Sequence, residues 1–200
     1  MRHTLKNLVL FKLGWLACVG FAATGKPLLA TAAVAVVALL HLVSVPNVVK
    51  EALLLMTAAL IGLAWESFLV ATGLLVYPGY EGAGFIAPYW IVAMWVLFAT
   101  TINYGLKWVK KGWPIAIAAG LIGGPLAFYG GASMGAVEFS HTLTALAVIG
   151  AGWAVLLPLL VLISDTIIDS PWLEPGSKPV HAAPEFAPLP IFERRLNSDR

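Results

Sequence analysis

Six apolar segments, separated by short turns that contain polar residues, glycine or proline, occupy the chain up to Ile168. Each segment has roughly the 17 to 25 residues that a helix needs to cross about 30 Å of hydrocarbon, the first being the shortest. The pattern predicts an all-α fold, a polytopic membrane bundle of six transmembrane helices forming one domain over residues 1–168. The predicted spans are residues 8–23, 28–45, 52–76, 89–107, 113–130 and 143–164.

The composition changes after Ile168, where a polar segment with recurring prolines replaces the apolar pattern. Because residues 169–200 offer no periodic apolar face to pack, we predict a Pro-rich cytoplasmic tail that is extended or disordered. A docking segment for a partner protein is the alternative, because proline-rich segments lose little conformational freedom on binding. The prolines are Pro171, Pro175, Pro179, Pro184, Pro188 and Pro190.

Composition supports the membrane class, because 60% of the residues are hydrophobic, 11% are charged and the mean hydropathy is +0.89. The formal net charge of +2 is too small to indicate a nucleic-acid partner. The single cysteine, Cys18, has no second thiol for a disulfide or a zinc site, and we predict that it is a small packing residue. No motif predicts a cofactor or a metal ion.

The basic residues predict the orientation in the membrane. With the N-terminus in the cytoplasm, Lys26 alone among the twelve Lys and Arg residues lies on the outer side. The positive-inside rule therefore predicts that both termini are cytoplasmic. A cleaved signal peptide over residues 8–23 is the alternative, but a signal peptide should precede a soluble domain, and five further apolar segments follow.

One acidic residue, Glu66, lies near the middle of the third predicted span. A carboxylate at membrane depth is costly unless it is protonated, paired or hydrated. Its estimated depth matches that of Gly123, Gly124 and Pro125 in the fifth span, where Pro125 removes the usual donor to the carbonyl of Leu121. We predict a helix break there and expect Glu66 to face the bundle interior and contact it. Glu66 then either holds a cation or a proton, or bonds a neighbouring helix for structural reasons.

Three polar residues share a second depth. Lys12, His41 and Asn103 lie about 6 to 8 Å on the cytoplasmic side of the predicted midplane. Together they would form a layer that binds an anionic headgroup or passes a proton. The structural alternatives are that Lys12 extends to the interface, that His41 bonds a backbone carbonyl and that Asn103 joins two helices.

Small residues recur every four positions in and after the fifth span, at Gly120 and Gly124 and again at Gly131 and Gly135. Such spacing permits close contact between helix backbones in membranes. We therefore expect this segment to pack tightly on a neighbouring helix.

Five sequence blocks occur in the order F-K-L-G-W-L-A-C-V-G, G-L-A-W-E-S-F-L, L-F-A-T-T-I-N-Y-G-L-K-W, G-G-P-L-A-F-Y-G-G-A-S-M-G-A-V and W-A-V-L-L-P-L-L. Together they resemble the bacterial inner-membrane family known as domain of unknown function 2878, over about residues 8–163. The resemblance implies a multi-pass protein of the bacterial cell inner membrane without an assigned reaction. In the family pattern, Asp stands at Glu66, an Asn-His pair stands at Asn103 and Tyr104, and Tyr stands at Phe128. Tyr104 therefore removes a titratable group, which weakens a proton relay here.

Three functions fit these observations. We favour a non-catalytic accessory or scaffold protein for other membrane or lipid-modifying proteins, with membrane lipids and a membrane-protein partner or a second copy as its contacts. A small carrier or channel that uses Glu66 is the first alternative, and an enzyme that modifies lipids through Lys12, His41 and Asn103 is the second. A scaffold predicts a tightly packed bundle, a carrier predicts a cavity that reaches Glu66, and an enzyme predicts a lateral opening beside His41.

Overall fold

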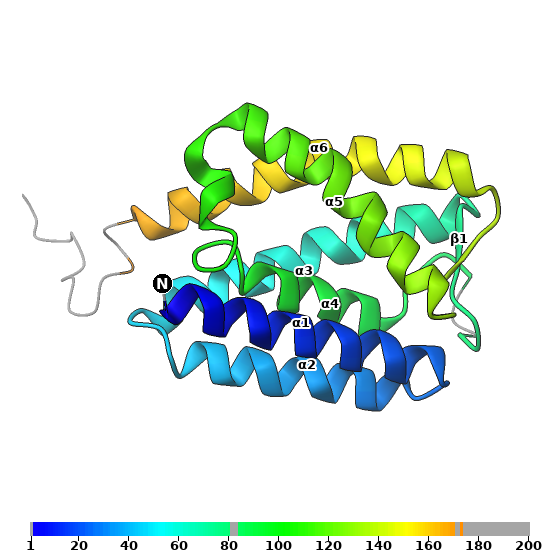
Figure 1. The fold of residues 1–200 in the computed structure, drawn as a ribbon, viewed down its shortest axis with the longest axis horizontal. Helices are drawn as coiled ribbons and strands as arrows, with labels where there is room; N and C mark the ends of the chain where they lie inside the picture. The colour runs from blue at the N-terminus through cyan, green and yellow to red at the C-terminus, as the bar shows by residue number, and fades with distance from the viewer. Residues whose placement is uncertain (1, 81–83, 171–172, 174–200) are drawn as a thin grey trace, which may run out of the picture.

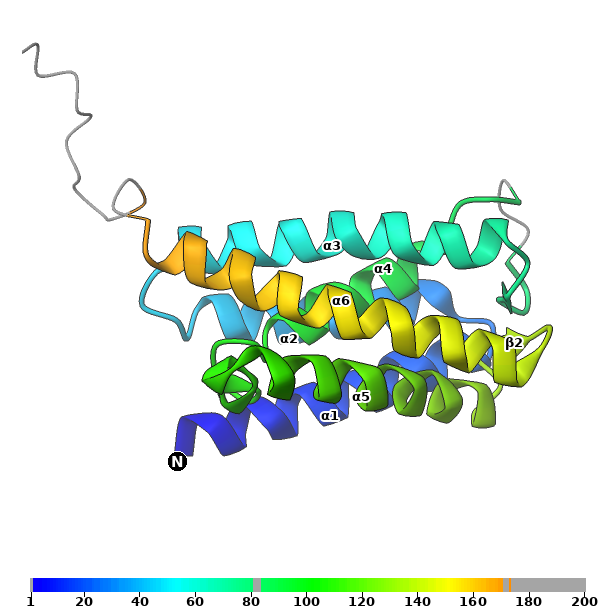
Figure 2. The ribbon, with the colours of Figure 1, turned by 90° about the horizontal axis from the view of Figure 1, so that it is seen from above.

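The computed structural model describes residues 2–80, 84–170 and 173, and most of this part of the chain is helical. Six α-helices in the described residues run alongside one another (Figures 1 and 2). They are α1 (Arg2–Ala23), α2 (Pro27–Leu42), α3 (Val48–Ala71), α4 (Tyr89–Ala99), α5 (Trp113–Ser133) and α6 (Thr142–Ile168). A 3-10 helix, η1 (Lys107–Lys111), and two short strands, β1 (Leu75–Val76) and β2 (Glu138–Phe139), complete the described elements. The predicted tail lies almost wholly outside the described residues.

Four of these helices, α1, α3, α5 and α6, are long and apolar enough to cross a membrane. The chain is therefore an all-helical protein of the membrane class, with four candidate spans where the sequence predicted six. Helices α2 and α4 are apolar but have only 16 and 11 residues. At 1.5 Å per residue, α4 covers about 16 Å, roughly half of the hydrocarbon thickness.

Helix α4 ends at Ala99, eight residues before the predicted end of its span, because polar groups after it redirect the backbone. The hydroxyls of Thr100 and Thr101 donate hydrogen bonds to the carbonyls of the preceding turn. Asn7 of α1 then satisfies the turn, because its Nδ2 donates to the Thr100 carbonyl at 3.0 Å and its Oδ1 accepts from the Gly105 amide at 3.0 Å. An irregular backbone within a membrane bundle needs such internal partners.

Local signals fix the other helix boundaries. Gly25 turns the chain after α1 with a φ of +70°, and Pro27 begins α2 at a position where no amide donor is needed. Asn47 caps α3, since its side chain accepts a hydrogen bond from the Lys50 amide at 3.1 Å. Pro125 lies inside α5, which is continuous through Gly123 and Gly124. The predicted helix break is therefore wrong, because a proline inside a membrane helix removes one donor without ending the helix when neighbours pack around it.

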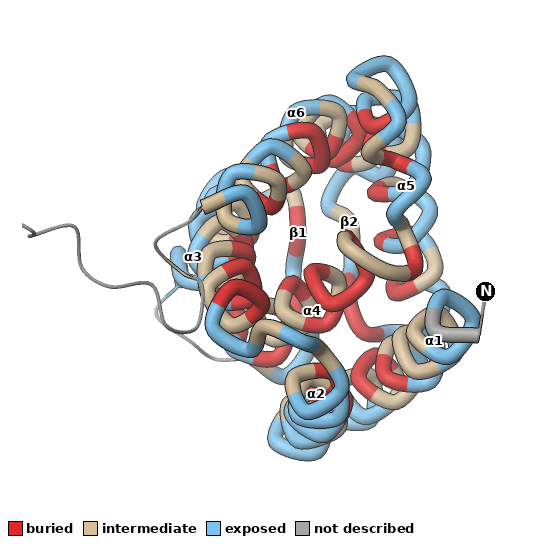
Figure 3. The backbone as a smooth tube through the Cα atoms, turned by 90° about the vertical axis from the view of Figure 1, so that its left-hand side faces the viewer, coloured by how far each residue is buried: buried red, intermediate tan, exposed pale blue. Residues whose placement is uncertain are grey.

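The buried faces of the helices point toward a common core, with α4 at its centre (Figure 3). Helix α4 packs against α1, α2 and α3, whereas α5 packs chiefly against α6 and η1. Large apolar side chains such as Leu28, Leu126 and Leu143 are exposed on the outer faces. An apolar exterior around an apolar core is expected where lipid, and not water, surrounds the helices.

The two ends of the bundle differ. At one end, β1 pairs antiparallel with β2, with Leu75 opposite Phe139, so the α3–α4 and α5–α6 connections lie together. At the other, here called the polar end, lie the start of α1, the α2–α3 connection, η1 and the end of α6 (Figures 1 and 2). The described Lys residues other than Lys26 and Lys12 are carried by elements near the polar end.

Candidate functional site

Glu66 lies on the inner face of α3 and has no exposed surface. Two donors from other elements meet its carboxyl group. The indole Nε1 of Trp95 on α4 donates to Oε1 at 2.9 Å, and the hydroxyl of Tyr77, just after β1, donates to Oε2 at 2.9 Å. Both oxygens are therefore hydrogen-bonded, and Glu66 ties α3 to α4 and to the connection between them.

The prediction that Glu66 faces the bundle interior is confirmed, but its predicted contact with the break in α5 is wrong. Its hydrogen bonds go to Trp95 and Tyr77, and the carbonyl of Leu121 lies instead against Gly150 of α6. The contact with α5 does not form because α3 packs mainly against α4 and α6. Buried Trp and Tyr side chains usually form a hydrogen bond through their N–H or O–H group. This tendency could have indicated Trp95 and Tyr77 as donors to Glu66.

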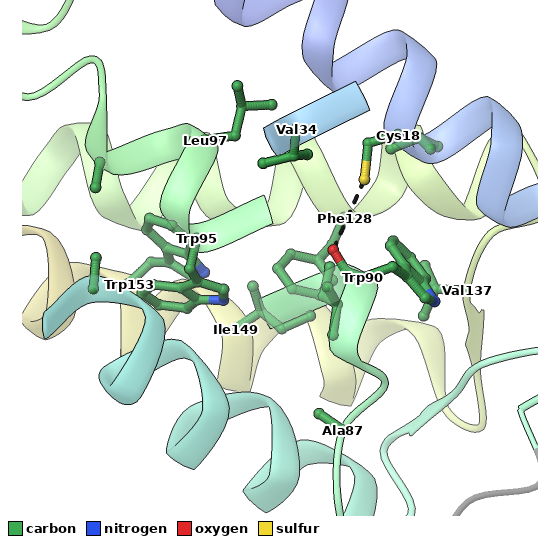
Figure 4. Close-up of a cluster of buried hydrophobic side chains, with 14 of the residues drawn as sticks. Cys18, Val34, Ala87, Trp90, Trp95, Leu97, Phe128, Val137, Ile149 and Trp153 are labelled. Atoms are coloured by element: carbon green, nitrogen blue, oxygen red, sulfur yellow. Dashed lines mark hydrogen bonds between the residues drawn. The ribbon is translucent and has the colours of Figure 1, made fainter. Parts of the chain in front are cut away.

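An aromatic cluster lies beside this carboxyl group, and Figure 4 shows its members Trp90, Trp95, Phe128 and Trp153. The rings of Trp95 and Trp153 stack with their centroids 4.7 Å apart, and Phe98 packs edge-on against Trp153 at 5.0 Å. The Trp153 Nε1 is buried and has no hydrogen-bond partner within the described part of the chain. Cys18 is fully buried beside the Trp90 carbonyl, as expected for a packing residue.

Two neighbouring hollows adjoin the cluster. A small cavity of about 90 Å³ lies against Glu66 and Tyr77, and its remaining walls are apolar or glycine. A larger groove of about 760 Å³, here called the α1–α5 groove, runs beside it and shares the walls Phe11, Phe98 and Trp153. Figure 3 shows α1 and α5 as neighbours on this side of the bundle. Ala127 also lines both hollows, and the other groove walls are Leu106, Trp108, Val109, Pro114, Ile115, Ala118, Ala119, Ile122, Gly123, Gly124 and Leu157.

A hydrogen-bonded polar network joins the helices at the polar end. Glu51 of α3 contacts the His41 Nε2 of α2 at 3.1 Å and accepts a bond from Asn103 Nδ2 at 2.9 Å. The Asn103 Oδ1 in turn accepts from Lys110 Nζ at 2.5 Å and from Ser164 Oγ at 2.7 Å. Lys110 also forms an ion pair with Asp165 at 2.8 Å, which brings the end of α6 into the network. The residues are His41, Glu51, Asn103, Lys110, Ser164 and Asp165.

The structure brings together two of the three residues of the predicted layer. His41 and Asn103 both bond Glu51, whereas Lys12 is exposed and its ammonium lies 5.7 Å from the centre of the Trp15 ring. Glu51 was the residue that sequence reasoning missed. The sequence does place this carboxylate at the end of a span, near basic residues on the neighbouring connections. It does not show which of those residues the carboxylate contacts.

The polar side chains near His41 leave a hollow of about 50 Å³ between α1 and α2, lined by Lys6, Asn7 and Tyr104 among others. The His41 ring faces Glu51 on one side and packs edge-on against Tyr104 at 5.2 Å. Within the described residues, no group of three His, Cys, Asp or Glu side chains is placed to hold a metal ion. The hydrogen bonds of the polar network connect α2, α3, η1 and α6.

We expect Asn103→Ala to lower the free energy of unfolding by roughly 1 to 3 kcal/mol, because Glu51, Lys110 and Ser164 would each lose a partner in a half-buried site. Thermal unfolding in detergent measures the change. Thr166→Ala is the matched control at the same end, since that exposed hydroxyl bonds only its own helix. Equal stabilities of the two variants would show that the network does not hold the helices together.

The chain matches a known family over most of its length. The family model described as "Protein of unknown function (DUF2878)" covers residues 4–159. The chain belongs to this family. Comparisons with curated proteins and with solved structures found no match. The matched part of this DUF2878 protein includes Glu66, Glu51 and Asn103 and ends before Ser164 and Asp165.

Proposed function

We propose that this protein is a non-catalytic accessory protein of the bacterial cell inner membrane, which holds a lipid chain for other membrane or lipid-modifying proteins. The α1–α5 groove is the observation that carries the proposal. Its volume of about 760 Å³ falls within the range of roughly 300 to 1,000 Å³ that is usual for ligand sites. A scaffold without a ligand has no need for such an opening.

The walls of the groove suit an alkyl chain. They contain aliphatic, aromatic and small residues and no charged side chain. The small residues Ala118, Ala119, Gly123 and Ala127 recur along one face of α5, and no atom lies within 4 Å of the position that a Gly123 Cβ would take. Because the groove lies among helices that are long and apolar enough to cross a membrane, its apolar walls suit the acyl chains of the surrounding bilayer.

The carrier and enzyme alternatives have weaker support. The small cavity does reach Glu66, as a carrier requires, but its other walls are apolar and both Glu66 oxygens are hydrogen-bonded within the bundle. An ion would lack polar groups along its path. The enzyme alternative needs room for a lipid headgroup beside His41, and the hollow there, of about 50 Å³, is small for such a substrate.

The proposed orientation places the polar end and both termini in the cytoplasm, because the lysines of η1 and Lys50 gather at that end and Lys26 lies at the other. In this orientation the exposed Trp108 and Trp113 lie at the cytoplasmic interface, where tryptophan is common in membrane proteins.

Matched substitutions test the lipid site. Ala118 and Gly123 line the groove, whereas Ala151 is exposed on α6 and lines none of the hollows described above. We expect Ala118→Leu and Gly123→Leu to fill the groove and to reduce the lipid that co-purifies with the chain several-fold, and Ala151→Leu to leave it unchanged. Mass spectrometry of the protein released from mild detergent measures the retained lipid. Unchanged retention in all three folded variants would overturn the proposal.

The accessory role has a separate test. A tagged chain purified from its own membrane, with lipids retained, should bring a second membrane protein with it. Recovery of the chain alone would contradict the accessory role and leave the lipid site standing.

A further inference from the structure

We infer that the α1–α5 groove takes one chain of an anionic phospholipid, whose phosphate is held at the polar end by Lys107 and Lys111 of η1 and by Lys12 of α1. The inference rests on the proposed lipid site and adds the class of headgroup. Its basis is the placement of two exposed lysines on the short helix that lines one end of an apolar groove, with a third exposed lysine on the helix that forms the opposite wall.

Helix η1 closes the groove at the polar end. Trp108 and Val109 line the groove, and the side chains of Lys107 and Lys111 on the same short helix are exposed. Lys110 is used differently, because its ammonium bonds Asn103, Ser164 and Asp165. Two lysines thus stand beside the end of the groove with their charges available to a ligand.

Lys12 brings a third cation from the opposite wall. It follows Phe11, which lines the groove, and it is exposed on α1. The N-terminus of α1 is at the polar end, so Lys12 lies about three turns of helix from that end. In the structure this ammonium lies 5.7 Å from the centre of the Trp15 ring, and the long, flexible Lys12 stem can carry it to a phosphate at the end of the groove that η1 lines.

The three ammonium groups lack a carboxylate partner within the part of the chain that the structure describes. Lys12 contacts only the face of the Trp15 ring, although a cation at membrane depth is costly when no anion is near. A lipid phosphate would supply the missing anion, and lysine binds phosphate well as a compact charge. Basic pockets between helices on the cytoplasmic side bind anionic headgroups in this way.

A net negative phospholipid is favoured over a zwitterionic one. Both carry a phosphate, but the choline or ethanolamine cation of a zwitterionic lipid would meet the same three lysines and be repelled. The cytoplasmic leaflet is also the side on which anionic lipids attract polybasic segments. The occupant is therefore a glycerophospholipid such as phosphatidylglycerol, with one acyl chain in the groove.

The test compares spin-labelled phosphatidylglycerol with spin-labelled phosphatidylcholine on the full chain in bilayer nanodiscs. We expect the intact protein to immobilise phosphatidylglycerol preferentially, and added salt to reduce the preference. Each of Lys12→Gln, Lys107→Gln and Lys111→Gln should lower the preference, by about five-fold where the lysine contributes fully. The triple variant should show none. Lys26→Gln, at the opposite end, is the matched control and should retain it.

The outcomes separate the headgroup from the site. If the triple variant keeps the preference for phosphatidylglycerol, or if Lys26→Gln loses it equally, the assignment of the headgroup to these lysines is wrong. If Ala118→Leu nevertheless releases the lipid, the groove remains a lipid site and only the headgroup inference fails. If neither lipid is immobilised and the groove variants behave as the intact protein, both proposals fail.

Discussion

Gly120→Ala is expected to destabilise the bundle by roughly 1 to 3 kcal/mol, through forced separation of α5 and α6. A Cβ at this position would lie 2.1 Å from the Trp153 carbonyl oxygen and 2.6 Å from its carbon. These are backbone atoms of the facing helix, so no rotation of a side chain relieves the overlap. The whole contact has to open, and the loss of close packing outweighs the better helix propensity of alanine.

Gly123→Ala is the matched control three residues along the same helix. No atom lies within 4 Å of its Cβ position, which opens into the α1–α5 groove. Alanine is favoured over glycine inside a helix by roughly 0.5 to 1 kcal/mol, so this variant should be as stable as the parent or slightly more stable. Thermal unfolding of both in the same detergent measures the difference. Similar losses in the two variants would mean that the destabilisation does not arise from the α5–α6 contact at Gly120.

This pair also shows how far glycine spacing predicts packing. The expected close contacts at Gly120 and Gly124 are confirmed, since both meet Trp153 of α6. The second spacing, Gly131 and Gly135, does not act in the same way. Gly135 lies beyond the end of α5 with a φ of +82°, so it forms a turn and not a helix face. Small residues four positions apart indicate a close helix contact only when both lie within the helix, and the spacing does not show where the helix ends.

The positions of the helices follow closely from the hydrophobic pattern, because apolar length and turn residues are local properties. The early end of α4 does not, because it depends on hydrogen bonds between Asn7 and residues more than 90 positions away. A span predicted from hydropathy alone ran through Thr100 and Thr101, whose hydroxyls bond back to the chain. Such bonds do not by themselves mark the end of a helix, since Thr57 makes the same kind of bond inside α3.

The candidate site was predictable in part for a similar reason. The cost of a carboxylate in a membrane helix requires an interior position, which identifies Glu66 from its own chemistry. Its partners depend on which helix packs against α3, and the depth estimate pointed to Pro125, whereas the partners in the structure are Trp95 and Tyr77. The groove could not be predicted from the hydrophobic pattern. An alanine or glycine that lines an opening has the same hydrophobicity as one that packs against a neighbouring helix.

The largest effect at a side chain is expected for Glu66→Ala. The change leaves the Trp95 N–H and the Tyr77 O–H without an acceptor in a site with no exposed surface, and it opens a cavity. We expect a loss of roughly 2 to 4 kcal/mol in the free energy of unfolding. Glu66→Gln should stay within about 1 kcal/mol of the parent, because its oxygen still accepts from Trp95 and its amide can donate to the Tyr77 oxygen.

A double-mutant cycle separates these bonds from the cavity. Tyr77→Phe removes one donor and should cost about 1 kcal/mol in the parent, but it should cost nothing further once Glu66→Ala has removed the acceptor. Equilibrium unfolding in mixed detergent gives the four free energies. Independent, additive losses would show that Tyr77 and Glu66 stabilise the protein through packing and not through their hydrogen bond.

Glu66→Gln also distinguishes a structural carboxyl from a functional one. If Glu66 holds α3 against α4, the Gln variant keeps both the stability of the bundle and its retained lipid, because shape and hydrogen bonding are conserved. A Gln variant that folds normally but loses the phenotype of the parent would show that the ionisable proton is used, which favours the carrier alternative. If Glu66→Ala changes neither stability nor lipid retention, the bonds to Trp95 and Tyr77 do not hold the bundle together. The interior assignment of this carboxyl would then be wrong.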